Sequence, residues 1–214
     1  MIFLFVVETY DKSNYKMTSL KTSSPTVALF KKELRRYLSS SIYVMNTSVG
    51  MLLVLMAAVA AAFVGAEGFI KIMMQSGDAD ITMAINAMKD MLQFMPLMLI
   101  CFGVGISCTT GSSISLEGKN LWILKSSPVK AFDIFKGKIA VNLALTIPSI
   151  ILCTILFWIG FDLTFVNTMW TLLIPTLLAV LVAVSGVIIN LYFPKMEWKN
   201  ETQVVKQSLS SMVS

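Results

Sequence analysis

The residues that could do chemistry in this 214-residue chain are few, and they form no catalytic set. The chain has no histidine, no paired carboxylates within an apolar stretch, and no Cys, Asp or Glu cluster with metal-ligand spacing. Cys101, Cys108 and Cys153 all lie in apolar stretches, where we expect small packing side chains rather than disulfide partners. We therefore expect no catalytic residue, no metal site and no cofactor site, and we do not expect an enzyme.

Two Gly-Lys pairs fall short of the nucleotide-binding P-loop, whose pattern is G-x-x-x-x-G-K-S/T. Gly118-Lys119 is followed by asparagine and lacks the first glycine of the pattern, and Gly137-Lys138 is followed by isoleucine. The chain is not expected to hydrolyse ATP on its own by that route.

Four long stretches of the chain contain no charged residue, and they form the framework for its remaining polar side chains. These stretches are 37–66, 91–116, 139–161 and 163–194. Each exceeds the roughly 20 residues that cross a bilayer as a helix. With 56% hydrophobic and only 14% charged residues, the chain has too little polar sequence to cover four buried helices in a soluble protein. We predict an all-α, polytopic helical membrane protein with one domain over 1–214. The predicted transmembrane helices span 44–66, 91–115, 139–161 and 168–191.

The net charge of +5 is distributed in a way that orients the chain in a membrane. Fifteen of the 17 basic residues lie before the first stretch, between the second and third, or after the fourth. Because positively charged loops stay in the cytoplasm, we expect both termini and the central loop there, in a multi-pass protein of the cell membrane. The expected partner of these charges is the lipid bilayer, and no nucleic acid is expected.

The segment 24–43 is predicted to form a connecting helix along the inner membrane surface. Ser24-Pro25 matches a helix start, and apolar residues then recur at helical spacing opposite a charged face that includes Glu33. The basic side chains of that face are expected to meet anionic headgroups. The candidate functional residues of this helix are Phe30, Lys31, Lys32, Leu34, Arg35 and Arg36.

Small residues recur every four positions in the first two predicted spans. Small side chains at this spacing allow helices to approach closely in lipid, so we expect helix contacts at these positions. They are Ala57, Ala61 and Gly65 in the first span, and Gly103, Ser107 and Gly111 in the second.

The segment 116–138 carries large apolar side chains outside the predicted spans, and these need a surface to bury them. Ser127 before Pro128 predicts a helix start, with a short helix through Lys136 after an earlier turn or helix over 116–125. Two such short helices on the cytoplasmic face suit either packing on lipid or docking of a soluble protein, and the residues alone leave both open. The apolar residues are Leu121, Trp122, Leu124, Phe132, Ile134 and Phe135.

The spacing of this segment resembles the loop between the second and third spans of ABC-2 type transporter permeases. The resemblance lies in Leu124-x-x-x-Pro128-Val129, followed by Ile134-x-x-Gly137-Lys138 and an apolar span. It covers about 24–214, and FKKEL at 30–34 is similar to the family's connecting helix. A narrower group of ABC exporter permeases is similar in the runs SLEGK at 115–119, NLYFPK at 190–195 and NETQVVKQS at 200–208.

The resemblance implies the membrane-spanning permease subunit of an ATP-driven ABC-2 type exporter. It implies that a separate ABC-type ATPase subunit uses the ATP and binds the coupling loop at 116–138, and that a second permease unit or a homodimer completes the transporter. The coupling residues so implied are Glu117, Leu121, Trp122, Leu124 and Pro128, with Phe132 and Phe135 as helix anchors.

The chain departs from the family pattern in two respects. Commoner members have a Gly-Thr-x-Glu order in this loop, which the residues before Glu117 do not match. Family units also have six spans where four fit here, so two more are expected after Ser214, with 195–214 as a cytoplasmic tail. The alternatives are an ATP-independent channel or secondary carrier, and a membrane scaffold that transports nothing. No polar constellation in the spans identifies a substrate.

Overall fold

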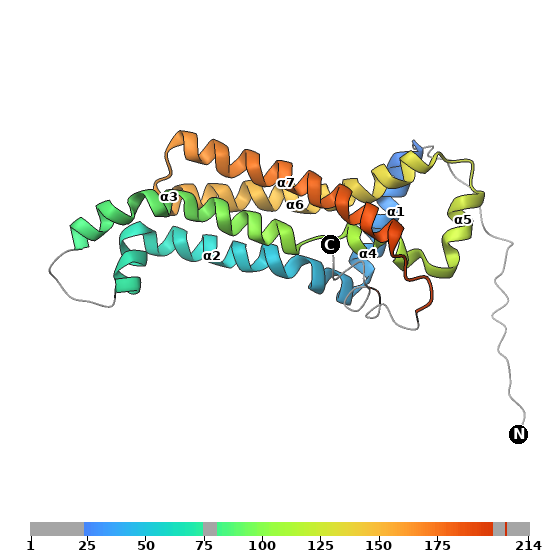
Figure 1. The fold of residues 1–214 in the computed structure, drawn as a ribbon, viewed down its shortest axis with the longest axis horizontal. Helices are drawn as coiled ribbons and strands as arrows, with labels where there is room; N and C mark the ends of the chain where they lie inside the picture. The colour runs from blue at the N-terminus through green and yellow to red at the C-terminus, as the bar shows by residue number, and fades with distance from the viewer. Residues whose placement is uncertain (1–23, 75–80, 199–203, 205–214) are drawn as a thin grey trace, which may run out of the picture.

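The computed structural model describes residues 24–74, 81–198 and 204, and this part of the chain is helical without a strand (Figure 1). The prediction of an all-α protein is confirmed. The helices are α1 (Pro25–Ser39), α2 (Ser41–Met74), α3 (Ile81–Ile106), α4 (Thr110–Ser113), the 3-10 helix η2 (Ser115–Asn120), α5 (Leu121–Ser126), α6 (Ala131–Phe161) and α7 (Phe165–Tyr192).

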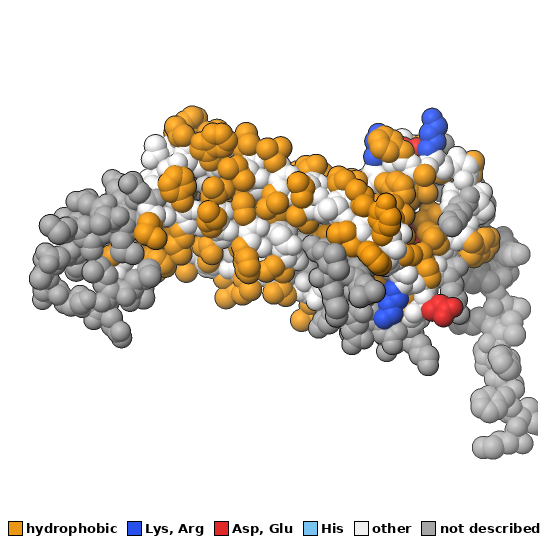
Figure 2. Space-filling model, in the orientation of Figure 1, with side chains coloured by type: hydrophobic (Ala, Val, Ile, Leu, Met, Phe, Trp, Pro, Cys, Tyr) orange, Lys and Arg blue, Asp and Glu red, His pale blue; other side chains and the backbone are white. Residues whose placement is uncertain are grey.

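Within the described residues, four segments are long and apolar enough to cross a membrane: Ser41–Lys71, Met91–Gly118, Ala131–Phe161 and Phe165–Tyr192. Large apolar side chains remain exposed along the outside of these segments, as lipid-facing side chains do. Figure 2 shows apolar side chains along the length of the bundle, whereas the visible charged side chains gather at one end. The fold is that of a polytopic helical membrane protein.

The four long helices form a ring in which α2 packs on α3 and α6, and α7 completes the ring between α3 and α6. Helices α2 and α6 run away from the end where α1 lies, and α3 and α7 return to it (Figure 1). We call the end of the bundle where α1 lies the α1 end. The centre of the ring is filled by fully buried residues from all four helices, among them Ala58, Ile100, Cys153, Phe157 and Ala179.

Small residues bring neighbouring helices into backbone contact. A Cβ added to Gly103 of α3 would lie 2.6 Å from Cγ2 of Val54 and 3.1 Å from the carbonyl oxygen of Gly50, both on α2. The hydroxyl of Ser107 accepts a hydrogen bond from the backbone N–H of Met51 at 3.2 Å. The predicted helix contacts at Gly103 and Ser107 are therefore confirmed.

Gly65 has a different role from the one its spacing indicated. Its φ of +69° and ψ of 172° interrupt α2, in a region that is essentially restricted to glycine. A Cβ on Gly65 would have only the carbonyl oxygen of Gly160 nearby, at 3.9 Å, so no close helix contact requires a glycine here. Gly65 therefore kinks the helix at the point where Glu67 introduces charge.

The predicted second span, 91–115, lies within the candidate span Met91–Gly118. It is not one helix, because α3 ends at Ile106 and the chain resumes as the separate short helix α4. No short helix ends at Lys136 either, since α6 starts at Ala131 and runs unbroken to Phe161. Ser127 is the C-cap of α5 and does not start a helix. Gly137 lies within α6, where its missing Cβ leaves room for Leu29 of α1.

Some expectations fall outside the described residues. These are the basic residues of 1–23, most of the similarity run at 200–208, and most of the predicted cytoplasmic tail at 195–214.

Candidate functional site

The candidate site begins where the second span breaks, at the α1 end of the bundle. Between Ser107 and Glu117 nearly every side chain is buried although most are polar. A broken helix exposes backbone N–H and C=O groups, and such groups are tolerated at membrane depth only where protein satisfies them.

Two asparagines from other helices satisfy the broken backbone. Asn142 of α6 accepts hydrogen bonds from the N–H and hydroxyl of Thr109, at 3.2 and 3.0 Å. Asn190 of α7 accepts from the N–H groups of Ile114 and Ser115, at 2.8 and 2.9 Å, and its amide donates to the Ser115 hydroxyl at 2.8 Å. The segment after the break is thus fixed to both α6 and α7.

Glu117 ends this segment inside a cluster of ion pairs. Its carboxylate lies 3.1 Å from Nζ of Lys32, 3.1 Å from Nη1 of Arg36 and 3.2 Å from Nζ of Lys138. Lys138 also lies 2.8 Å from the carboxylate of Glu33. We call these five residues the Glu117 cluster, and it joins α1, η2 and α6.

The cluster is hidden from solvent on one side and open on the other. The side chains of Lys138 and Glu117 are 1% and 4% exposed, whereas that of Lys32 is 45% exposed. Lys138 further donates to the carbonyl oxygen of Ser113 at 2.9 Å, and Arg36 donates to that of Leu116. The buried charges are therefore both paired and hydrogen-bonded, which offsets the cost of taking them out of water.

The predicted position of Glu33 on the connecting helix was wrong. The sequence pattern placed it on the polar face of α1, but it is buried and faces Lys138, because α1 packs along α6. Burial raises the pKa of the Glu33 carboxyl above its ordinary value, against the opposing attraction of the Lys138 ammonium.

The turn after Glu117 is held by the chain that follows α7. The indole N–H of Trp198 donates to the carbonyl oxygen of Ser115 at 2.9 Å, and the N–H of Lys195 donates to the Ser115 hydroxyl at 2.9 Å. Gly118 has φ +51°, and a Cβ there would lie 2.9 Å from Nε1 of Trp198. A glycine therefore allows the chain to turn sharply beneath the indole.

Helix α5 stands off the bundle from this turn, and its principal contact is with η2 (Figure 1). Trp122 and Ile123 are 65% and 52% exposed, and Leu121 and Leu124 are half-buried. Across the Ser127–Lys130 connection, Phe132 is 67% exposed at the start of α6. The structure thus leaves an apolar surface uncovered at the α1 end, and we call Trp122, Ile123 and Phe132 the apolar tip.

The other predicted site residues divide between exposed and packed positions. Pro128 is exposed and Phe135 is half-buried in α6. On α1, Phe30 and Leu34 are half-buried against the bundle, and the basic residues Lys31 and Arg35 are exposed.

The sequence interpretation missed the residues that build the interior of the site, namely Glu33, Lys138, Asn142 and Asn190. Lys138 had been counted among loop charges, although it stands directly before an apolar span. Its position there, together with the amides Asn142 and Asn190 within two long uncharged stretches, was the available signal.

A hollow of about 320 Å³ lies toward the end of the bundle opposite the α1 end. Its lining is almost wholly apolar and includes Ala57, Ala61, Phe69, Met95 and Phe157. Among the described residues, no three Cys, Asp or Glu side chains lie close enough to hold a metal ion.

Comparison with family models, with curated proteins and with solved structures found no match for this chain. The class that the fold defines is the polytopic helical membrane protein, and any finer assignment depends on the site itself.

Proposed function

We propose that this chain is the permease subunit of an ATP-driven exporter of the ABC-2 type, coupled through α5 to a separate ATPase subunit. The observation that carries the proposal is the apolar tip. Trp122 and Ile123 stand exposed on α5, whose principal contact is with η2, and Phe132 is exposed at the start of α6. Exposed large apolar side chains at the charged end of the molecule typically mark a protein contact.

The connection behind the tip suits the transmission of force. A partner that moves α5 also moves η2, and through the Glu117 cluster it moves α1 and α6. Asn142 and Asn190 extend the same connection to α6 and α7. ATP binding shifts the spans only if the partner contacts two arrangements of the bundle with different affinity, and a rigid connection makes that possible.

In this proposal the α1 end faces the cytoplasm, where ATP is available. The partner subunit hydrolyses the ATP, and this chain does not. The basic residues at this end favour that orientation. A second permease unit or a second copy of this chain pairs with it. The uncovered apolar surface of the bundle is compatible with either arrangement.

Site-specific photo-crosslinking from the apolar tip tests the proposal. A photoreactive residue at Trp122 or Ile123 is expected to crosslink, in intact membranes, to a protein that contains a P-loop, which mass spectrometry identifies. The matched control is Phe102, which is also exposed but lies on α3 within a span. Adducts to lipid alone would instead favour an ATP-independent channel or carrier, and adducts to a protein without a P-loop would favour a scaffold.

A further inference from the structure

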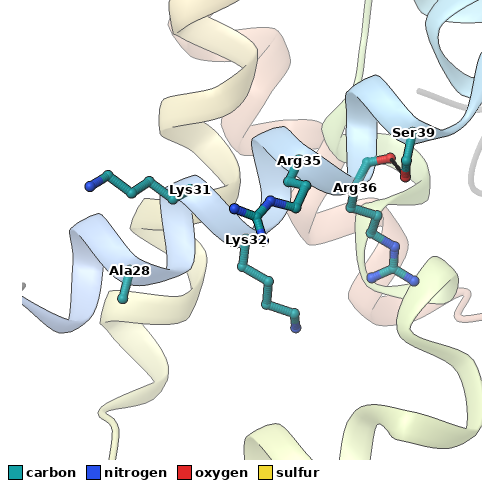
Figure 3. A pocket seen from close by; sticks show the side chains of 6 residues that line it. All are labelled: Ala28, Lys31, Lys32, Arg35, Arg36 and Ser39. Carbon is teal, nitrogen blue, oxygen red and sulfur yellow. Dashed lines mark hydrogen bonds between the residues drawn. The ribbon is translucent and has the colours of Figure 1, made fainter. Parts of the chain in front are cut away.

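A basic hollow of about 620 Å³ follows the outward face of α1, separate from the apolar tip. It is lined by Ala28, Lys31, Lys32, Arg35, Arg36 and Ser39 (Figure 3). Four of these six side chains are cationic. Figure 3 shows Lys32 and Arg36 extending to the same side of the helix, while Lys31 extends away from them.

The four cations are not equivalent. Lys32 and Arg36 are already paired with Glu117, at 3.1 Å each. Within the described part of the chain, neither Lys31 nor Arg35 has an ion pair or side-chain hydrogen bond. Two like charges four residues apart on a helix repel each other unless an anion lies between them, and the planar guanidinium of Arg35 suits a phosphate.

The position of the hollow favours a phosphate that belongs to a lipid headgroup. Only Ser40 separates α1 from α2, so the hollow lies at the edge of the apolar belt. Val27, one turn before Lys31, and Leu38, one turn after Arg35, are exposed apolar side chains that acyl chains can cover. Basic groups at this depth bind the headgroups of anionic lipids.

We infer that the hollow on α1 binds the phosphate-bearing headgroup of one anionic phospholipid, through Lys31 and Arg35. A uniformly basic helix face would use all four cations alike, whereas this site depends mainly on the two that Glu117 does not neutralise. Lys32 is half-exposed and lines the hollow while it contacts Glu117, so the headgroup lies next to the Glu117 cluster. The inference concerns lipid binding alone and does not require the proposed ATPase partner.

Native mass spectrometry of the full chain, purified in mild detergent, tests the inference with phosphatidylglycerol and with phosphatidylcholine of the same acyl chains. The wild-type chain is expected to retain one phosphatidylglycerol in preference to phosphatidylcholine. Lys31→Gln combined with Arg35→Gln is expected to weaken that binding about thirtyfold, from the usual gain per basic residue near an anionic surface. Lys136→Gln, which removes an exposed charge from α6, is the matched control and is expected to change binding little.

Three results would overturn the inference. One is unchanged phosphatidylglycerol binding in the double variant. Another is displacement of the lipid by millimolar inorganic phosphate, which would make the hollow a site for free anions. The third is binding of a poly-glutamate peptide in place of the lipid, which would make it a protein-docking surface. If the double variant melts at a lower temperature, Arg35→Lys is used instead, and its expected result is weaker binding at unchanged net charge.

Discussion

At the scale of single residues, Lys138 is the residue on which the candidate site depends most. It is buried, pairs with two carboxylates that come from α1 and η2, and holds the carbonyl oxygen of Ser113. Its removal leaves Glu33 without its ion-pair partner in a buried position and leaves Glu117 with only its outer partners. Breaking a buried ion pair in this way typically costs about 3–5 kcal/mol.

Lys138→Met is therefore expected to lower the free energy of unfolding by about 3–5 kcal/mol. Thermal unfolding in detergent, followed by circular dichroism, measures the change. Lys136→Met is the matched control two residues away, because Lys136 lies over the Phe132 ring at 4.4 Å in an exposed position. It is expected to cost at most about 1 kcal/mol, and equal losses in the two variants would show that the cluster is not a stabilising element.

Glu33 gives the site a dependence on pH. Burial raises the native pKa of its carboxyl above the ordinary value of 4.5, so the folded chain keeps this proton to a higher pH than the unfolded chain does. The contribution of this group to stability is greatest below the ordinary pKa and is lost as pH rises through the raised native pKa. The melting temperature of the wild type should thus fall relative to that of Glu33→Gln across this window. A difference that moves in favour of the wild type as pH rises would contradict this prediction.

At the scale of elements, the pattern of apolar and charged residues predicted the long helices and α1, but not the break in the second span. Long apolar stretches require helices, because lipid offers no hydrogen bonds to the backbone. The break after Ile106 depends instead on distant side chains, since Asn142 and Asn190 are what satisfy the interrupted backbone. Glu33 was misplaced for the same reason, because only the packing of α1 on α6 brings it to Lys138.

The kink at Gly65 predicts a contrast between two glycines. Gly65→Ala is expected to cost about 1–3 kcal/mol, because its φ of +69° and ψ of 172° suit only glycine. Gly105→Ala lies in α3 with no atom within 4 Å of the added Cβ, so it is expected to be neutral or to stabilise by up to about 1 kcal/mol. Melting temperatures in one detergent give both values. Equal changes in melting temperature for the two variants, or a larger loss for Gly105→Ala, would contradict the proposed requirement for glycine at the Gly65 kink.

At the scale of the whole molecule, four spans place the α1 end and the α6–α7 connection on opposite sides of the membrane. Phe165, at the start of α7, and Trp122, on α5, are both exposed and mark the two sides. The orientation itself was predicted from charge, because the folded structure contains no membrane to define inside and outside.

Cysteine labelling tests this orientation in a chain whose three native cysteines are replaced by alanine. A membrane-impermeant maleimide is expected to label Phe165→Cys on intact cells, and to label Trp122→Cys only after the cells are broken. Labelling of Trp122→Cys on intact cells would place the apolar tip outside the cell and would contradict coupling to a cytoplasmic ATPase.

The most direct test of the central claim is the ATPase activity of the nucleotide-binding subunit that the proposal expects to copurify with this chain, measured in lipid nanodiscs. With the wild-type chain, the activity of that subunit is expected to rise on assembly. Trp122→Ala combined with Ile123→Ala is expected to reduce this rise at least about tenfold at limiting subunit concentration, as the loss of two exposed apolar anchors should. Met98→Ala combined with Phe102→Ala, which alters equally exposed side chains on α3, is expected to leave it unchanged. Full stimulation by the Trp122 and Ile123 double variant would contradict coupling through the apolar tip.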